Sequence, residues 1–195
     1  MAWVRSEYAS EFAVLSAWLS MVLPWNLVYH SSVPTNPVRS EMGIIRLSIV
    51  ELQFRFPGRI TGLPGGPRTA RNLLEEMYPG MRLFQDVYVV TPIGSGTHYS
   101  GYLQWGSLAW ALGAFALLLS FAFSLAFYLR EDELTDRLSA DPVRIIGGLL
   151  GVATLALSAA SVLYFFERDL VGIPIPLGLL VMGALSTALL RAERT

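Results

Sequence analysis

The sequence predicts an all-α membrane protein with four transmembrane helices and a small extracellular α+β cap between helices 1 and 2. The first reason is composition: 53% of the residues are hydrophobic and only 15% are charged, whereas about a quarter of the residues of soluble domains are charged. The second reason is that four long runs contain no Asp, Glu, Arg or His. These runs are Phe12–Tyr29, Leu103–Leu129, Ile145–Phe166 and Ile173–Leu190.

The lengths of the runs set the expected helices. Crossing ~30 Å of hydrocarbon takes roughly 20 apolar residues. The second and third runs exceed this length, and the first and fourth, with 18 residues each, lie within the usual range. We therefore expect three regions. They are an N-terminal segment with helix 1 (1–30), the cap (31–100), and helices 2–4 (about 103–129, 145–166 and 173–190) with a cytoplasmic tail (101–195).

Pro24, Trp25 and Asn26 stand together near the end of the first run. A proline inside a helix removes one backbone donor and clashes with the carbonyl four residues back, which predicts a kink. Tryptophan favours the membrane–water interface, and Asn26 offers an amide where backbone bonding is broken. We interpret the three residues as a kink and interface anchor. The alternative is a broken helix that lines a substrate site.

The cap contains one strong strand signal, the stretch IIRLSIVELQFRF at residues 44–56. Apolar and polar residues alternate with period two, which favours a half-buried strand. The phase slips once, at Ile49–Val50, as a β-bulge would produce. An amphipathic helix at the membrane surface remains the alternative. A short helix is expected at residues 69–78, with Thr69 as its N-cap and a Pro-Gly pair after it.

The arginines near the short loops predict the orientation. All 14 basic residues are Arg, and cytoplasmic loops carry an excess of positive charge. The loop at 130–144 and the C-terminal tail together hold Arg130, Arg137, Arg144, Arg191 and Arg194, whereas the turn at 167–172 holds Arg168 alone. We therefore expect a multi-pass protein of the cell membrane with both termini cytoplasmic and residues 31–100 extracellular.

Small residues recur at four-residue spacing in the apolar runs. Gly147 and Gly151 form a G-x-x-x-G motif. The same four-residue spacing separates Ala109 from Gly113 and Gly183 from Thr187. Small residues allow close approach of helix backbones in lipid. The motif fits packing inside the bundle, and it also fits a contact with a helix of another membrane protein.

The remaining composition argues against several functions. The chain has no cysteine, so it has no disulfide, no thiolate metal site and no cysteine nucleophile. We expect no catalytic, cofactor or metal site, because two isolated histidines are a poor metal signature. The net charge of −1 gives no indication of a nucleic-acid partner. The expected partner is the lipid bilayer, and the expected role is a non-enzymatic accessory or scaffold subunit. A small-solute permease or channel lined by Ser and Thr hydroxyls is the alternative.

Two stretches carry a family resemblance: MAWVRSEYASEFAVLSAWLSMVLPWN at the N-terminus and RLSIVELQFRF after it. Together they resemble an uncharacterised family of multi-pass membrane proteins from haloarchaea. The motifs W-V-R-S-E-Y and L-P-W-N and the alternating strand are the most specific, and the later runs match only as generic apolar spans. The resemblance implies a membrane location and a haloarchaeal host, and it implies no activity.

Overall fold

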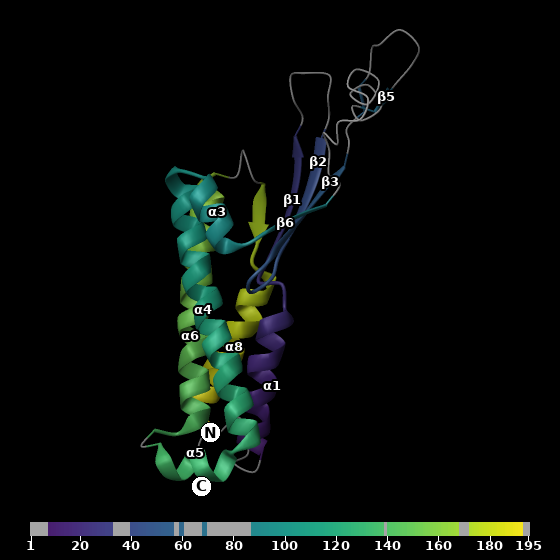
Figure 1. The fold of residues 1–195 in the computed structure, drawn as a ribbon. Coiled ribbons are helices and arrows are strands. Elements are labelled where there is room, and N and C mark those ends of the chain that lie inside the picture. Colours follow the sequence, from purple (N-terminus) through teal and green to yellow (C-terminus); the bar gives the residue numbers. More distant parts are fainter. Residues whose placement is uncertain are drawn as a thin grey trace.

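A helical bundle with a sheet at one end makes up the protein (Figure 1). The computed structural model describes residues 8–32, 40–56, 59–60, 68–69, 87–138, 140–167 and 172–192. In chain order the elements are α1 (Ala9–Val22), β1 (Asn26–Ser32), β2 (Ser40–Arg46), β3 (Glu51–Phe56), β4 (Arg59–Ile60), β5 (Arg68–Thr69), β6 (Val87–Val90), α3 (Pro92–His98), α4 (Gly101–Leu129), α5 (Glu131–Arg137), α6 (Pro142–Phe166), β7 (Ile173–Ile175) and α8 (Leu177–Leu190).

The two long helices, α4 and α6, form the centre of the bundle. They have 29 and 25 residues, which gives lengths of about 43 Å and about 37 Å. Both are long and apolar enough to cross a membrane, by length and composition. The start of α6 has a clear sequence cause: the side chain of Asp141 accepts a hydrogen bond from the backbone N–H of Val143, and Pro142 occupies the first turn. Proline is favoured there because the first turn leaves its N–H groups unpaired.

The outer helices, α1 and α8, are shorter than expected. Each has 14 residues, or about 21 Å, so two of the four expected helices fall below the length that crosses a bilayer. The expected helix at 173–190 begins with strand β7 instead, and the first apolar run continues past α1 as strand β1. The physical reason is proline: Pro24, Pro174 and Pro176 cannot donate a helical hydrogen bond. The class is therefore mostly helical with a sheet, and the all-α prediction was incomplete.

The sheet has five antiparallel strands in the order β6-β3-β2-β1-β7. The predicted single strand at 44–56 is two strands, and the predicted bulge at Ile49–Val50 lies in the turn 47–50 between them. The alternative of a surface helix there was wrong. Thr69, the expected N-cap of a helix at 69–78, lies in β5, and residues 70–78 lie outside the described part.

Apolar side chains lie both inside and outside the bundle. The interior combines large apolar side chains with small residues and hydroxyls, among them Trp110, Leu117, Ile146, Leu150, Leu157, Met182, Ala13, Ala17, Ser107, Ala114, Ser120, Ser124, Ala153, Ala160 and Ser186. Large apolar side chains cover the outside of all four main helices, among them Leu15, Val22, Leu108, Leu112, Phe115, Leu155, Val162, Phe165, Leu180 and Leu190. Such an extended apolar surface is uncommon on soluble monomers.

Candidate functional site

Pro24 ends α1 and lets the chain turn directly into β1. The last carbonyls of a helix have no partner within the helix and need one elsewhere. The carbonyl of Met21 accepts a hydrogen bond from the hydroxyl of Ser48 at 2.9 Å. The backbone N–H of Trp25 donates to the carbonyl of Arg46 at 3.0 Å. Pro24 is therefore a helix terminus, and the predicted kink within a longer helix was wrong.

Two tryptophans hold the turn between β2 and β3. The indole Nε1 of Trp25 donates to the carbonyl of Leu47 at 3.0 Å, and that of Trp110 donates to the carbonyl of Ser48 at 2.8 Å. Their ring centroids lie 6.2 Å apart, and both side chains have 0% exposure. A buried tryptophan usually pairs its N–H. Trp25 is thus a core residue, and its predicted role as an interface anchor was wrong.

A buried ion pair lies at the end of the β2–β3 hairpin. Arg46 and Glu51 are directly opposite one another in the register, and the Nε atom of Arg46 lies 2.5 Å from Oε2 of Glu51. The second oxygen of Glu51 accepts from the side-chain amide of Gln53. Arg46 and Glu51 have exposures of 2% and 4%. Burying two charges costs several kcal/mol unless each is paired, and here each charge compensates the other.

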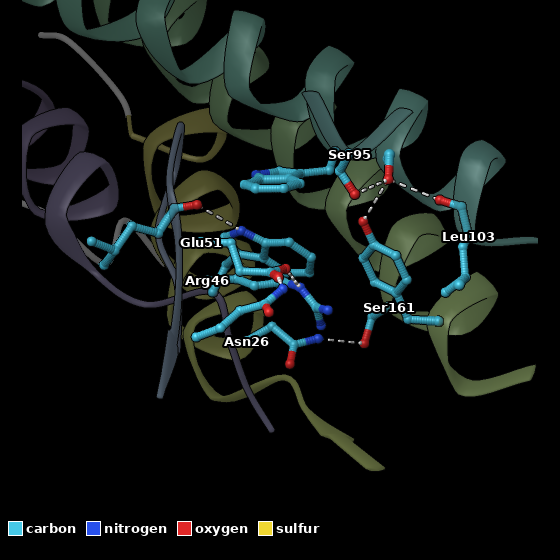
Figure 2. A network of polar contacts seen from close by, with 12 residues as sticks. Asn26, Arg46, Glu51, Ser95, Leu103 and Ser161 are labelled. Carbon is cyan, nitrogen blue, oxygen red and sulfur yellow. Dashed lines mark hydrogen bonds and ion pairs between the residues drawn. The ribbon is translucent and has the colours of Figure 1, made fainter. Parts of the chain in front are cut away.

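The ion pair faces the helices (Figure 2). The guanidinium carbon of Arg46 lies 4.1 Å from the ring centroid of Tyr164 on α6, a cation–π geometry. Asn26, which is opposite Arg46 in the register, donates from Nδ2 to the hydroxyl of Ser161 on α6 at 3.3 Å. Asn26 therefore joins the sheet to a helix. From the sequence, this amide is expected to serve backbone groups near the break in the helix. In the structure it donates to a side chain of α6 instead.

The hydroxyl of Ser107 on α4 is the second centre of polar contacts; Figure 2 labels two of its partners, Ser95 and Leu103. This hydroxyl lies 2.8 Å from the carbonyl of Leu103, 2.9 Å from the hydroxyl of Ser95 and 3.2 Å from the hydroxyl of Tyr164. A serine hydroxyl has one donor and two acceptor positions, so it can donate to the carbonyl and accept from the other two. These contacts join α3, α4 and α6.

We call these residues together the junction network. Its members are Trp25, Asn26, Arg46, Ser48, Glu51, Gln53, Ser95, Ser107, Trp110, Ser161 and Tyr164. Two of its atoms, Nη1 of Arg46 and Oδ1 of Asn26, have no hydrogen-bond partner among the described residues. The network fixes the sheet to the long helices through polar contacts that an apolar core alone would not provide. In the described ranges, no three His, Cys, Asp or Glu residues are grouped so that they could hold a metal ion.

The predicted helix-packing residues lie between helices of this chain. A Cβ atom at Gly113 would lie 2.6 Å from Cγ of Leu157, and one at Gly147 would lie 2.9 Å from Cβ of Leu189. At Gly151 and Gly183 the nearest neighbours, Ser186 and Thr154, would lie at 3.0 and 3.6 Å. Ala109 is half-buried and packs against the core. The contacts therefore favour packing inside the bundle over the partner-helix alternative.

Gly178 makes a closer approach than any of these and was missed by sequence reasoning. A Cβ there would lie 2.7 Å from Cα of Trp25, and it would contact the carbonyl oxygen of Pro24 even more closely. The glycine lets the first turn of α8 press against the chain that leaves α1. No small-xxx-small spacing marks it, because its neighbour is an irregular segment and not a helix.

A groove of about 460 Å³ lies at the other end of the bundle. The last turns of α4 and helix α5 line it, through Ala122, Leu125, Ala126, Leu129, Arg130, Glu133 and Leu134. Arg130 and Glu133 lie 3.6 Å apart and are well exposed, so their pairing contributes little. The lining lacks a set of converging polar groups of the kind that orients a polar substrate.

The sequence comparisons give one match. A family model described as a family of unknown function (DUF7549) matches residues 2–194. No curated protein matches the chain.

Proposed function

The chain belongs to the DUF7549 family of unknown function, and we propose that it is an integral membrane protein that serves as a non-enzymatic accessory or scaffold subunit. The observation that carries this proposal is the extended apolar outer surface of the bundle. Leu112, Leu155 and Leu180 are among the large side chains that point outward, with exposures of 56%, 73% and 73%. Water would solvate these side chains unfavourably, at about 25 cal/mol per Å² of apolar surface, whereas lipid would not.

The interior supports the same location. Helices in lipid gain no hydrophobic driving force from one another and associate through small residues and polar contacts. Such contacts connect the helices here: Ser186 of α8 donates to the carbonyl of Gly147 on α6 at 2.8 Å. The short helices fit as well, because each joins an extended segment at the sheet end that lengthens its path across the bilayer.

We propose a multi-pass topology in the cell membrane with both termini cytoplasmic and the segment 31–100 extracellular. Helices α1 and α8 start and finish, respectively, at the end of the bundle that carries α5, and the sheet lies at the opposite end (Figure 1). The α5 end carries Arg130, Arg144 and Arg191, in agreement with the excess of positive charge on cytoplasmic loops.

A scaffold role follows from the junction network. Its charges are paired inside the protein, and its hydrogen bonds connect the hairpin β2–β3 with α1 and α4 and connect β1 with α6. Such an arrangement holds the sheet at a fixed angle to the helices. A rigid platform of this kind suits the presentation of a surface to a partner membrane protein, and it needs no reactive group.

A channel for small neutral solutes is the second candidate, and one observation favours it. The hydroxyls of Ser16, Ser20 and Ser120 are buried and have no hydrogen-bond partner in the described part of the chain. Helical serines usually bond to a carbonyl of the preceding turn, as Ser124 does with Phe121. Unpaired hydroxyls between α1 and α4 could instead line a path for water or a small polyol.

Reconstitution separates the two roles. Purified protein is inserted into liposomes, and osmotic swelling with glycerol or urea is compared with empty vesicles and with a Ser120→Leu variant. The scaffold proposal predicts swelling equal to that of empty vesicles for both proteins. If the parent protein makes vesicles swell faster than empty vesicles, and the Ser120→Leu variant does not, the result would contradict the scaffold role and establish the channel. Release of the protein from membranes by alkaline carbonate would contradict both.

A further inference from the structure

We infer that the part of the sheet next to the helices lies in the lipid leaflet at that end, with its outer face against acyl chains. This inference rests on the proposed membrane location and adds a lipid-facing sheet to it. We use the name outer sheet face for the two rows nearest the helices on the side of the sheet that faces away from them. By register these rows are Ile175, Leu27, Ile45, Leu52 and Val89, and then Ile173, Tyr29, Gly43, Phe54 and Val87. By register a third row, Ser31, Glu41 and Phe56, follows farther from the helices and is not part of the inference.

The outer sheet face is both exposed and apolar, which is unusual for a sheet in water. Apart from Gly43 and the hydroxyl of Tyr29, its two rows are aliphatic or aromatic, and Tyr29, Ile173 and Ile175 have exposures of 59%, 60% and 54%. The opposite face is buried and mixed, because it carries Arg46 and Glu51 beside Val28 and Ile44. In water an antiparallel sheet turns its polar face to the solvent, so an exposed apolar face favours apolar surroundings.

The lengths of the elements place the same rows in the membrane. Helix α8 rises about 21 Å, about 9 Å short of the ~30 Å hydrocarbon layer. Strand β7 continues from its start, and a strand rises about 3.3 Å per residue, so Ile173–Ile175 supplies the missing length. On α4 the exposed aromatic residues Trp105 and Tyr128 lie about 35 Å apart, which is the spacing of two aromatic belts.

If the sheet lay wholly outside the lipid, α1 and α8 would be shorter than the hydrocarbon layer that they have to cross. The bilayer would have to thin by about 9 Å around α1 and α8, at a fraction of a kcal/mol per Å. The exposed side chains of Val162, Phe165 and Phe166 near the end of α6 would then lie in water. Exposed apolar side chains continue from these residues over β7 to Leu177 at the start of α8. Because this apolar surface is unbroken, we assign lipid as the occupant of the outer sheet face as well.

The edge strand β7 is adapted to lipid. A strand edge in hydrocarbon is unfavourable because its outward N–H groups find no partner. Pro174 lies in β7 and Pro176 follows it, and neither has an N–H. A proline cannot donate to the neighbouring strand, so it occupies positions whose donors would point outward. Ile-Pro-Ile-Pro therefore presents an edge without outward donors at these two positions.

Depth-dependent quenching tests the inference. The chain has no cysteine, so Ile175→Cys, Leu180→Cys and Thr97→Cys can each carry one environment-sensitive fluorophore in the full-length protein. Leu180 is the control on the exposed face of α8, and Thr97 is the exposed control on α3. The labelled proteins are placed in phosphatidylcholine vesicles that contain nitroxide lipids, with the nitroxide near the headgroup or deep in the acyl chain, and aqueous iodide is titrated separately.

The inference predicts that the nitroxide near the headgroup quenches the label at Ile175 more than iodide does. The deep nitroxide should quench the label at Leu180, and iodide should quench the label at Thr97. Iodide quenching at Ile175 with lipid quenching at Leu180 would overturn the inference and leave the membrane location intact. Protection of Ile175 from both quenchers would also overturn it, in favour of a second protein chain on this face. Iodide quenching at Leu180 would instead refute the proposed membrane location.

Discussion

Gly178→Ala tests the contact between the first turn of α8 and the segment that follows α1. The new Cβ would lie 2.7 Å from Cα of Trp25 and 2.9 Å from the carbonyl carbon of Pro24. Carbon atoms in contact prefer 3.5–4.0 Å, so the two backbones must separate by about 1 Å. Both neighbours are backbone atoms, and no side-chain rotation can relieve the clash.

The magnitude follows from this geometry. Overpacking of this kind typically costs ~1–3 kcal/mol. The matched control is Gly148→Ala, whose Cβ would have no atom within 4 Å and which should gain about 0.5–1 kcal/mol because alanine favours the helix. The two variants should therefore differ by roughly 1.5–4 kcal/mol. For a chain of this size that is a difference of about 3–16 °C in Tm.

The assay is thermal unfolding of both variants and the parent in one detergent, followed by the loss of helical circular dichroism. Gly178→Ala should melt below the parent, and Gly148→Ala should melt at or above it. A Gly178→Ala variant that is as stable as Gly148→Ala would refute the close approach of α8 to Trp25, and with it the packing that positions β7 beside β1.

Three further predictions concern the packing of sheet and helices. Glu51→Leu should destabilise the protein by about 3–5 kcal/mol because it leaves Arg46 charged and buried; adding Arg46→Met should recover part of this loss in a double-mutant cycle, and purely additive losses would contradict the ion pair. Tyr164→Phe keeps the ring beside Arg46 and removes the contact with Ser107, so it should lose ~1 kcal/mol, less than Tyr164→Leu; equal losses in chemical denaturation would show that the ring contributes nothing. Gly147→Leu should separate α6 from α8 and cost ~1–3 kcal/mol, whereas an unchanged Tm would place this glycine on the lipid-facing surface.

The long helices could be predicted from the sequence because a run of apolar residues without charge has few alternatives. Helices α4 and α6 begin within about three residues of the expected positions and end at them. The ends of the first and fourth runs could not be predicted in the same way. Where an apolar run passes from helix to strand, the hydropathy is the same before and after the boundary. Pro24 did not mark the boundary either, because a proline is compatible with a kink as well as with a helix terminus.

The hairpin was missed because its turn carries only a weak signal. Residues 47–50, Leu-Ser-Ile-Val, contain no Gly, Pro, Asn or Asp, and serine, the one turn residue present, marks turns more weakly than these. The indoles of Trp25 and Trp110 hold the turn through hydrogen bonds from distant parts of the chain. A phase slip in an alternating pattern fits a bulge as well as a turn, and only tertiary contacts decide between them.

The junction network could have been found from one signal in the sequence. The alternation around Arg46 and Glu51 correctly predicted a half-buried strand, and it left open which of the two sides faces the helices. In a chain with so little charge, a strand that starts between apolar runs has apolar surroundings. Its charged side chains are then expected to face the protein and to pair there.

Cysteine accessibility in intact cells tests the central claim that the bundle crosses the cell membrane with the sheet outside. Thr97→Cys on α3 lies at the sheet end and Thr135→Cys on α5 lies at the opposite end, and both positions are exposed. We expect a membrane-impermeant maleimide to label Thr97→Cys in intact cells and to label Thr135→Cys only after the membrane is permeabilised. Labelling of Thr135→Cys in intact cells, or equal labelling of both variants before permeabilisation, would contradict this topology.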